Sequence, residues 1–193
     1  MTIEIRLSGS GGQGLLFIGR ILAEAAGVFE GKNAVQSSSY GGQVRGGSSR
    51  SDVLISPAEE EIDFPEVMDA DLLLAMNQEA ADEYSERVKH AGVVILDTTF
   101  VKQIPKTPGR IIGYPFTLKT KERLGSTLPT NIVVLAVISQ IGELVGKEAL
   151  VRAIKKRSPK GKDEINLQAL NFGFELVETG VLQRGEDDER ELH

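Results

Sequence analysis

A glycine-rich turn near the amino terminus constrains the fold of this chain more than any other feature. Apolar and charged residues alternate over residues 3–7, which predicts a short β-strand. Gly9, Gly11 and Gly14 follow in the pattern G-x-G-x-x-G. Apolar residues then recur with helical spacing over residues 15–29. A strand, a glycine turn and a helix in this order are typical of the opening of a Rossmann-like unit.

The rest of the chain continues this alternation of strands and helices. Strands are predicted at residues 34–39, 51–56, 71–76, 93–97 and 111–112, and helices at residues 78–89, 131–144, 147–156 and 164–177. The strands at 71–76 and 93–97 each contain a continuous apolar run, at residues 72–76 and 93–96, as expected where helices cover both faces of a parallel sheet. We therefore predict a Rossmann-like, doubly wound α/β fold with a mostly parallel sheet, helices on both faces and a helix-rich C-terminal third.

Length and composition favour a single domain. The chain has 193 residues, of which 40% are hydrophobic and 26% charged, and this is ordinary for a soluble globular domain. We expect residues 1–182 to form that domain and residues 183–193 to form a charged, frayed tail. No signal peptide precedes the first strand, and the longest apolar run, residues 132–138, is too short to span a bilayer. We therefore expect a cytoplasmic protein with no membrane contact.

Charge and residue usage exclude several classes of function. The net charge is −6 and no basic stripe is evident, which argues against nucleic-acid binding. The chain has no cysteine, so it cannot supply thiolate ligands to an iron–sulfur cluster or zinc, or a cysteine nucleophile. Only His90 and His193 are histidines, which argues against a histidine-based metal site or catalytic triad. We expect neither a metal site nor a complete catalytic set.

The first glycine loop has the character of an anion site. Unpaired N–H groups and the partial positive charge of a helix N-terminus favour a phosphate or carboxylate. An NAD-binding unit also needs an acidic residue at the end of its second strand, but residues 37–40 read Ser-Ser-Ser-Tyr. Three interpretations of the loop remain open: a bound anion, NAD(P), or a turn that only packs against a partner.

Four other polar residues lie near predicted strand ends or helix starts. They are Asn77, Asp97, Thr98 and Asn131. In an open α/β sheet these positions belong to the ligand-binding side. Helix capping explains Asn77 and Asn131 equally well.

A second glycine-rich segment is the more unusual of the two. Residues 41–47 contain four glycines and one charged residue, Arg45, which is followed directly by Gly46. A guanidinium flanked by glycines can bind a carboxylate or phosphate bidentately, and Tyr40 adds a hydroxyl and a ring. The alternative is a flexible surface loop with an incidental arginine.

Together, the two loops resemble the gamma subunit of 2-oxoacid:ferredoxin oxidoreductases. The similar segments are SGSGGQG at residues 8–14, GKNAVQ at 31–36, SYGGQVRGG at 39–47, DLLLA at 71–75 and NIVVL at 131–135. The resemblance extends from Ile3 to about Leu176. It is strongest to the 2-oxoglutarate type, while the pyruvate, branched-chain and indolepyruvate types share the motifs. Many members have Pro-Glu where this chain has Gly42-Gln43.

The resemblance implies a function as part of a larger enzyme. Enzymes of this type oxidatively decarboxylate a 2-oxoacid, form an acyl-CoA and pass electrons to ferredoxin. The resemblance implies alpha, beta and delta partner subunits, with thiamine diphosphate between alpha and beta and iron–sulfur clusters in the delta type. This chain is then a subunit without catalytic residues that packs beside the thiamine site and helps to bind CoA.

Eight residues of the two loops are the candidate CoA-binding residues. They are Gly9, Gly11, Gly12, Gln13, Gly14, Tyr40, Arg45 and Gly46. Two alternatives to this function stay open. The chain is otherwise a purely structural subunit of the same complex, or a stand-alone NAD(P)-type binding protein, against which the missing acidic residue argues.

Overall fold

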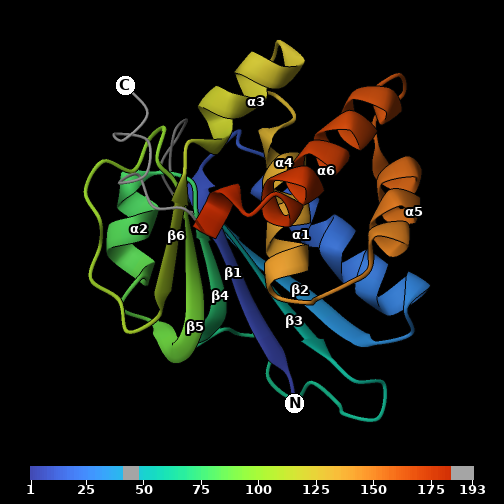
Figure 1. Ribbon diagram of the computed structural model, residues 1–193. Helices are drawn as coiled ribbons and strands as arrows, with labels where there is room; N and C mark the ends of the chain where they lie inside the picture. The colour runs from blue at the N-terminus through green and yellow to red at the C-terminus, as the bar shows by residue number, and fades with distance from the viewer. Residues whose placement is uncertain (41–47, 184–193) are drawn as a thin grey trace.

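A six-stranded sheet forms the centre of the computed structural model, which describes residues 1–40 and 48–183 (Figure 1). The strands lie in the order β2-β3-β1-β4-β5-β6. Their bounds are β1 Ile3–Ser10, β2 Asn33–Tyr40, β3 Ser48–Ser56, β4 Ala70–Ala75, β5 Val88–Asp97 and β6 Arg110–Tyr114. Strands β1, β4, β5 and β6 are parallel neighbours, whereas β3 is antiparallel to both β1 and β2. The predicted mostly parallel α/β fold is confirmed.

The edge of the sheet at β2 and β3 departs from a Rossmann unit. In a Rossmann unit the second strand lies beside the first. In this chain β3 pairs with the whole length of β1 and separates β1 from β2. Neighbouring strands are about 4.8 Å apart, so β2 lies roughly 10 Å from β1. The segment between β2 and β3, residues 41–47, lies outside the described residues. The strand whose end would bind a ribose in a Rossmann unit is therefore displaced from the first glycine loop.

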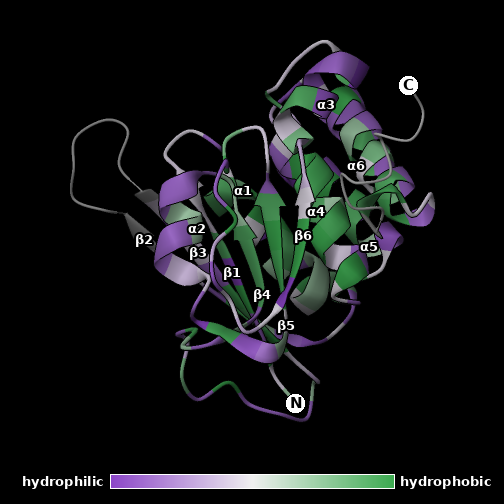
Figure 2. Cartoon of the chain, turned by 60° about the vertical axis from the view of Figure 1, so that its left-hand side comes forward, coloured by the Kyte–Doolittle hydropathy of each residue, from purple (hydrophilic) through white to green (hydrophobic). Residues whose placement is uncertain are grey.

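Helices cover both faces of the sheet, as predicted. Their bounds are α1 Leu15–Glu24, its π-helical continuation η1 Ala25–Phe29, α2 Gln78–Tyr84, α3 Phe116–Leu124, α4 Thr130–Ile141, α5 Lys147–Arg157, α6 Asp163–Glu178 and the 3-10 turn η2 Val181–Gln183. Figure 2 shows the apolar strands between α2 on one side and α4, α5 and α6 on the other. Each face has its own apolar core, and the larger one includes α1, α4, α5 and α6.

Two helices differ from the prediction. The helix expected at residues 78–89 ends at Tyr84, because the chain turns and begins β5 at Val88. Helix α3 was not predicted, since it follows a proline and carries mostly polar side chains. The predicted helices in the C-terminal third are confirmed within a few residues. Of the predicted tail, residues 184–193 lie outside the described residues.

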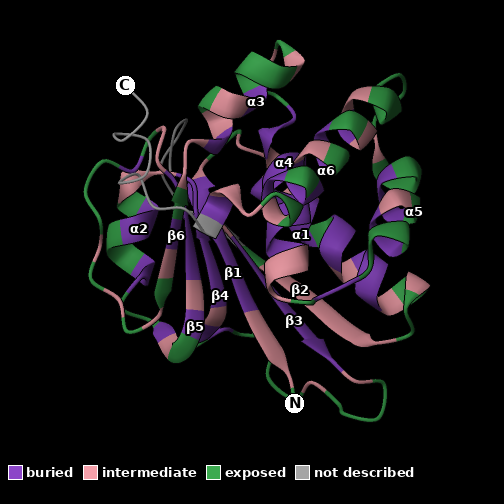
Figure 3. Cartoon of the chain, in the orientation of Figure 1, coloured by how far each residue is buried: buried purple, intermediate pink, exposed green. Residues whose placement is uncertain are grey.

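Helix α4 is the central helix of the larger core. Every side chain from residue 132 to residue 138 is fully buried, and Figure 3 shows the helix enclosed by its neighbours. Helix α6 approaches it at Gly173, where a Cβ atom would overlap the carbonyl oxygen of Val133 and lie 2.7 Å from Cβ of Ala136. The longest apolar run of the sequence is thus a core helix. No helix within the described residues is long and apolar enough to cross a membrane.

The opposite face of the sheet contains a buried ion pair that the sequence did not reveal. Arg6 on β1 donates from Nε and Nη2 to the Asp52 carboxylate on β3, at 3.0 and 2.9 Å. Its guanidinium lies 4.9 Å from the ring centroid of Tyr84 on α2, and Arg50 Nε lies 3.5 Å from Asp52. Because both main partners are almost fully buried, removing either would leave an uncompensated charge. The ion pair thus connects β1 to β3, and the Arg6 guanidinium packs against Tyr84 of α2.

Candidate functional site

The first glycine loop lies where β1 ends, at the carboxyl edge of the parallel strands. The side chain of Gln13 closes this loop and attaches it to the next strand. Its Oε1 accepts from Ser10 N–H at 2.7 Å, and its Nε2 donates to the carbonyl of Met76, just beyond β4, at 3.1 Å. The sequence predicted Gln13 as a ligand-binding residue, but its polar atoms are engaged in shaping the loop. A ligand would therefore meet the loop mainly through its backbone.

Two of the loop glycines are required by close packing. A Cβ atom on Gly9 would lie 2.9 Å from Cβ of Met76 and overlap the Gln13 amide oxygen. Gly14 precedes α1 with φ of 75°, and a Cβ there would overlap the amide nitrogen of Asn131 at the start of α4. Side chains do not fit at either position without displacing neighbours. Gly14 thus brings the starts of α1 and α4 together.

The other two loop glycines face open space. Gly11 and Gly12 are exposed, and a Cβ on Gly12 would meet no atom within 4 Å. Gly12 has φ of 92°, so its backbone conformation alone explains the glycine there. The four glycines therefore divide into a packed pair, Gly9 and Gly14, and an open pair whose backbone a ligand can approach.

A cavity of about 180 Å³ opens beside the loop. It is lined by Gly12, Gln13, Met76, Phe100, Thr117, Thr127, Leu128, Thr130 and Asn131. These residues come from the start of α1, the start of α3, the start of α4 and the ends of β4 and β5. None of the lining side chains within the described residues is charged. The cavity is thus surrounded by the N-terminal ends of three helices.

The helix ends at this cavity differ in how they are capped. The residues that precede α1 and α4, Gly14 and Pro129, supply no side-chain cap, and neither helix has an acidic residue in its first turn. Within the first turn of α4, however, the N–H of Ile132 is already bonded to the Pro129 carbonyl and to Asn131 Oδ1. The N–H groups of the two helix starts and their partial positive charges favour an anion. Helix α3 is different, because Asp97 accepts hydrogen bonds from the backbone N–H and the hydroxyl of Thr117. An anion would therefore be attracted to α1 and α4 and not to α3.

The polar residues at the strand ends act mainly as caps. Asp97 is fully buried and also accepts from Thr99 N–H at 3.0 Å, which leaves it no access to a substrate. Asn77 caps α2 by accepting from Ala80 N–H at 2.9 Å, and it donates to the Ser10 hydroxyl at 2.7 Å. Helix capping, the simpler of the two interpretations of Asn77, is therefore confirmed.

Thr98 and Asn131 complete this set of strand-end residues. Thr98 donates from its backbone to the Tyr114 carbonyl at 3.0 Å, as a continuation of the strand pairing. Asn131 uses its Oδ1 for the N–H of Ile132 at 2.9 Å and rests its amide against Gly14. Of the four strand-end residues, Asn131 alone lines the cavity.

Exposed apolar side chains surround the cavity. Leu128 is 80% exposed, Phe100 47% and Leu118 46%. Leu128 and Phe100 line the cavity itself, and Leu118 directly follows the lining residue Thr117 at the start of α3. Large apolar side chains gathered beside a cavity are typical of surfaces that contact another protein.

Those of the eight predicted site residues that the structure describes lie in different surroundings. The structure places Gly12 and Gln13 at the cavity, leaves Gly11 exposed in the loop beside them, and packs Gly9 and Gly14 against neighbouring side chains. The backbone of Tyr40 pairs with Ser49 at the end of β2. Arg45 and Gly46 lie outside the described residues, so their role stays a prediction.

Sequence reasoning missed the part of the cavity that comes from the start of α4. Thr127, Leu128 and Thr130 line it, and they follow one another just before the long apolar run. A proline at position 129 ahead of that run marks a helix start, and this signal could have drawn attention to the segment. Its position beside the glycine loop depends on tertiary packing.

An open α/β sheet with a glycine turn and an uncharged cavity at its carboxyl edge defines a Rossmann-like binding domain. Among residues 1–40 and 48–183, no group of side chains is arranged to hold a metal ion. Comparison with known proteins defines the family. Residues 4–176 match the model for pyruvate ferredoxin/flavodoxin oxidoreductase, and the chain belongs to this family.

Similar proteins agree with that assignment. The chain is 40% identical to the 2-oxoglutarate synthase subunit KorC of Methanocaldococcus jannaschii, over 92% of this chain and 95% of the relative. The gamma subunit of keto/oxoacid ferredoxin oxidoreductase from Geobacter sulfurreducens superimposes with a TM-score of 0.83 at 38% identity, covering 93% of this chain and 98% of the subunit. The predicted resemblance to gamma subunits is confirmed.

A longer relative shares the fold. The 2-oxoglutarate:ferredoxin oxidoreductase from Magnetococcus marinus, with 2-oxoglutarate, coenzyme A and succinyl-CoA bound, has a TM-score of 0.80 at 20% identity. The match covers 92% of this chain and 31% of the longer one. The same fold thus occurs as a segment of a larger chain.

Proposed function

We propose that this chain is the gamma subunit of a complex that oxidatively decarboxylates 2-oxoglutarate, forms an acyl-CoA and reduces ferredoxin. The high identity to 2-oxoglutarate synthase subunits, over nearly their full length, supports this substrate. Alpha and beta subunits would hold thiamine diphosphate, and a delta-type subunit would hold the iron–sulfur clusters. The absence of cysteine from this chain agrees with clusters held by a partner. The chain acts in the cytoplasm in this proposal.

Within this complex, we assign the glycine-loop cavity to CoA. The observation that carries the assignment is the meeting of two helix starts without acidic residues, α1 and α4, at a cavity beside Gly12 whose described lining carries no charge. CoA carries phosphates, which such helix ends favour. The Magnetococcus marinus protein, which shares this fold, binds CoA. Arg45, from the second glycine loop, would add a charged hydrogen bond to a phosphate.

The apolar rim of the cavity would be the contact with the partner subunits. Leu128, Phe100 and Leu118 would be covered by the alpha and beta subunits beside the thiamine site. CoA would then lie between this chain and the subunits that carry out the chemistry. This arrangement explains why a chain with no catalytic set contributes to the reaction.

Paired substitutions at Thr127 test the CoA assignment in the assembled complex. Thr127 is exposed and lines the cavity, and its side chain has no hydrogen bond to maintain the fold. Thr127→Asp adds a negative charge near the phosphates, whereas Thr127→Asn has nearly the same shape without the charge. We expect the KM for CoA to rise about threefold to tenfold for Thr127→Asp and to stay unchanged for Thr127→Asn. Arg45→Ala should raise it about tenfold to a hundredfold.

The control is the KM for the 2-oxoacid, which should not change in any of these variants. A CoA dependence that stays unaltered in assembled Thr127→Asp and Arg45→Ala complexes would refute the assignment. Purification under anoxic conditions shows whether thiamine- and cluster-bearing partners accompany the chain. A panel of 2-oxoacids then identifies the substrate, and a preference for pyruvate over 2-oxoglutarate would correct that part of the proposal.

A purely structural subunit is the second candidate, and the packed glycines favour it. Gly9 and Gly14 are explained by packing inside this chain, without any ligand. If the loops serve assembly alone, Arg45→Ala and Thr127→Asp weaken the complex and leave CoA kinetics intact. A stand-alone NAD(P) protein has less support, because β3 separates the end of β2 from the first loop. Titration of the chain with NADH and NADPH tests this alternative directly.

A further inference from the structure

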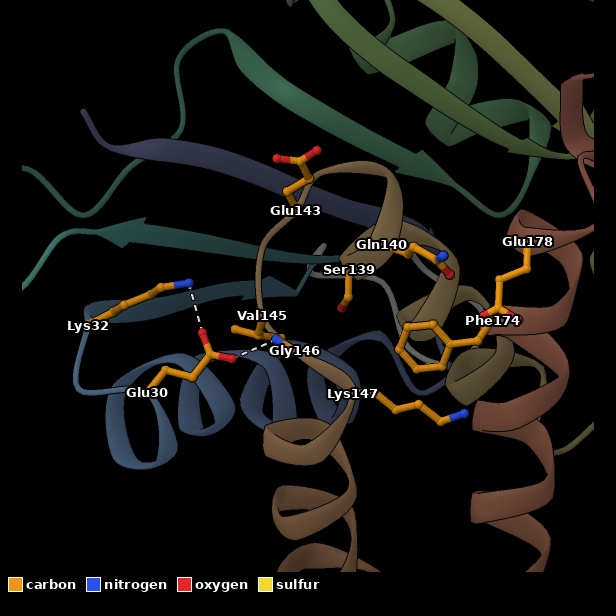
Figure 4. A pocket seen from close by; sticks show the side chains of 10 residues that line it. All are labelled: Glu30, Lys32, Ser139, Gln140, Glu143, Val145, Gly146, Lys147, Phe174 and Glu178. Atoms are coloured by element: carbon orange, nitrogen blue, oxygen red, sulfur yellow. Dashed lines mark hydrogen bonds and ion pairs between the residues drawn. The ribbon is translucent and has the colours of Figure 1, made fainter.

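A second and larger cavity lies at the other end of helix α4. Its volume is about 400 Å³, and it opens between the end of η1, the turn from α4 to α5, and helix α6 (Figure 4). It is lined by Glu30, Lys32, Ser139, Gln140, Glu143, Val145, Gly146, Lys147, Phe174 and Glu178. Ser139 lies nine residues beyond Thr130, which is about 14 Å along the helix. This cavity is therefore separate from the glycine-loop cavity.

Two polar groups in this cavity have no hydrogen-bond partner. The Ser139 side chain is fully buried, and neither its hydroxyl nor the buried Oε1 of Gln140 is hydrogen-bonded. Buried polar atoms are nearly always satisfied in folded proteins, because an unsatisfied one costs free energy. Both atoms belong to the last turns of α4 and both line the cavity. They are the polar atoms of this cavity that remain for the hydrogen-bond donor of a ligand.

The cavity also presents separate charges of both signs. Lys147 Nζ lies 5.1 Å from the ring centroid of Phe174, and Figure 4 shows Glu178 on the other side of that ring. Neither Lys147 nor Glu178 has an ion-pair partner within the part of the chain that the structure describes. Glu143 also lines the cavity, but Figure 4 shows its carboxylate pointing away from the Phe174 ring. Beside that ring a ligand thus meets one cation, Lys147, and one anion, Glu178.

The other charged pair at this cavity is already neutralised. Glu30 accepts from Lys32 Nζ at 2.8 Å and from Gly146 N–H at 2.6 Å. Lys32 donates in addition to the Leu144 carbonyl at 2.7 Å. This pair fixes the turn between α4 and α5 against the end of η1, and so forms one wall of the cavity. The charges left for a ligand are those beside Phe174.

We propose that this cavity binds a small zwitterion with a primary ammonium group and a carboxylate, such as a free amino acid. The ammonium group donates to the Ser139 hydroxyl and the Gln140 carbonyl, with Glu178 as its nearest counter-charge. The carboxylate pairs with Lys147, and the carbon chain packs on the Phe174 ring. A zwitterion satisfies both unpartnered polar atoms and both free charges, whereas a simple amine or a simple acid satisfies only part of them. The site is independent of the function proposed for the glycine loop.

Calorimetric titration of the full chain tests this proposal. The probes are L-alanine and L-glutamine as zwitterions, ethylamine as the ammonium group alone, acetate as the carboxylate alone, and glycerol as a neutral hydroxyl compound. We expect saturable binding of at least one zwitterion, with ethylamine and acetate each binding at least about tenfold more weakly. Glycerol should bind no better than either of them.

Two variants with matched controls locate the binding site. Ser139→Ala removes the unpartnered hydroxyl, and Lys147→Gln removes the free cation; each should weaken zwitterion binding about tenfold or more. Ser85→Ala is the control for the first, because Ser85 is another buried serine with an unpartnered hydroxyl, at the end of α2. Lys155→Gln is the control for the second, on an exposed position of the same helix α5. Both controls should bind like the unaltered chain.

Thermal unfolding keeps the binding experiment interpretable. Since the Ser139 hydroxyl has no partner, Ser139→Ala should unfold at a midpoint no lower than that of the unaltered chain. A folded Ser139→Ala variant that binds zwitterions normally would overturn the proposal. So would the absence of saturable binding by either zwitterion, which would leave water as the occupant. Glycerol binding that matches the zwitterions and ignores Lys147→Gln would assign the site to neutral hydroxyl compounds instead.

Discussion

The two ends of helix α4 face two cavities that are built in opposite ways. At its N-terminal end, the polar side chains of Gln13 and Asn131 are hydrogen-bonded or packed, and no charged side chain from residues 1–40 or 48–183 lines the cavity. At its C-terminal end, Ser139 and Gln140 leave polar atoms unpartnered among five charged residues. The first cavity offers backbone N–H groups and helix ends, whereas the second offers side chains. The two ends of one buried helix thus present different chemical groups, backbone N–H groups at one end and polar side chains at the other.

This comparison assigns different tasks to the residues at each end. Glycine and glutamine at the first end shape the backbone, so their substitution should affect stability before it affects ligands. At the second end, the Ser139 hydroxyl has no hydrogen-bond partner, so its removal should not lower the free energy of unfolding of the ligand-free chain. Three measurements of stability test this contrast between the two ends of α4.

The largest effect is expected for Gly14→Ala. The new Cβ would have to adopt φ near 75° and would overlap the Asn131 amide, so the free energy of unfolding should fall by about 2–4 kcal/mol. Adding Asn131→Ala to the same chain should restore the packing part of that loss, as measured by urea unfolding.

Gly12→Ala is the matched control for this prediction. Gly12 also has positive φ, at 92°, but a Cβ there meets open space, so only the conformational cost of about 1–2 kcal/mol applies. Equal losses for Gly12→Ala and Gly14→Ala would show that the contact between Gly14 and α4 is unimportant. The N-terminal cavity would then not depend on that contact.

The packed and open glycines show how far the sequence could predict this end of the molecule. The strand, turn and helix around Gly9 and Gly14 follow from local spacing, and the structure contains all three. The partner of Gly14 is Asn131, more than a hundred residues away, and local spacing carries no information on such a contact. The sequence therefore located the loop correctly and could not say which glycines face a ligand.

A second, intermediate effect compares a partnered with an unpartnered polar side chain. Gln13→Ala removes two hydrogen bonds, to Ser10 N–H and to the Met76 carbonyl, and should lower the free energy of unfolding by about 1–2 kcal/mol. Ser139→Ala removes none and should change it by less than about 0.5 kcal/mol. Urea unfolding of the two variants side by side gives the difference. A loss at Ser139 as large as that at Gln13 would mean that the serine hydroxyl has a structural partner.

The second cavity and helix α3 show what the sequence could not predict. Ser139 follows a continuous apolar run and reads as an ordinary core position. Its neighbours in the cavity come from η1, the start of α5 and α6, so no local motif connects them. Helix α3 is short and polar, and its start is capped by Asp97, which lies about twenty residues earlier. Both features depend on contacts between distant segments, which periodicity and turn signals do not reveal.

The smallest effect is a pH dependence confined to the C-terminal end. Burial raises the pKa of Glu30, but the ion pair with Lys32 and the hydrogen bond from Gly146 N–H outweigh it, so the pKa lies below its ordinary value of 4.5. A carboxyl with a lowered folded pKa stabilises the fold above its unfolded pKa, and this contribution is lost as the pH falls through the folded pKa. The unaltered chain should therefore lose stability on acidification relative to Glu30→Gln, by less than about 1 kcal/mol.

The difference in the free energy of unfolding between the unaltered chain and Glu30→Gln isolates the contribution of Glu30 from those of the other acidic residues. Glu24, whose pKa is raised by burial and lowered more strongly by Arg157 and Lys156, titrates in the same direction in both chains and cancels in the difference. The difference in unfolding free energy between the unaltered chain and Gln13→Ala should stay constant with pH, because the part of the chain that the structure describes brings no titratable side chain to the N-terminal cavity. Urea unfolding between about pH 3 and pH 7 measures both differences. If the Gln13→Ala difference varied with pH as strongly as the Glu30→Gln difference, a charged group would also act at the glycine loop, and the contrast between the two ends would fail.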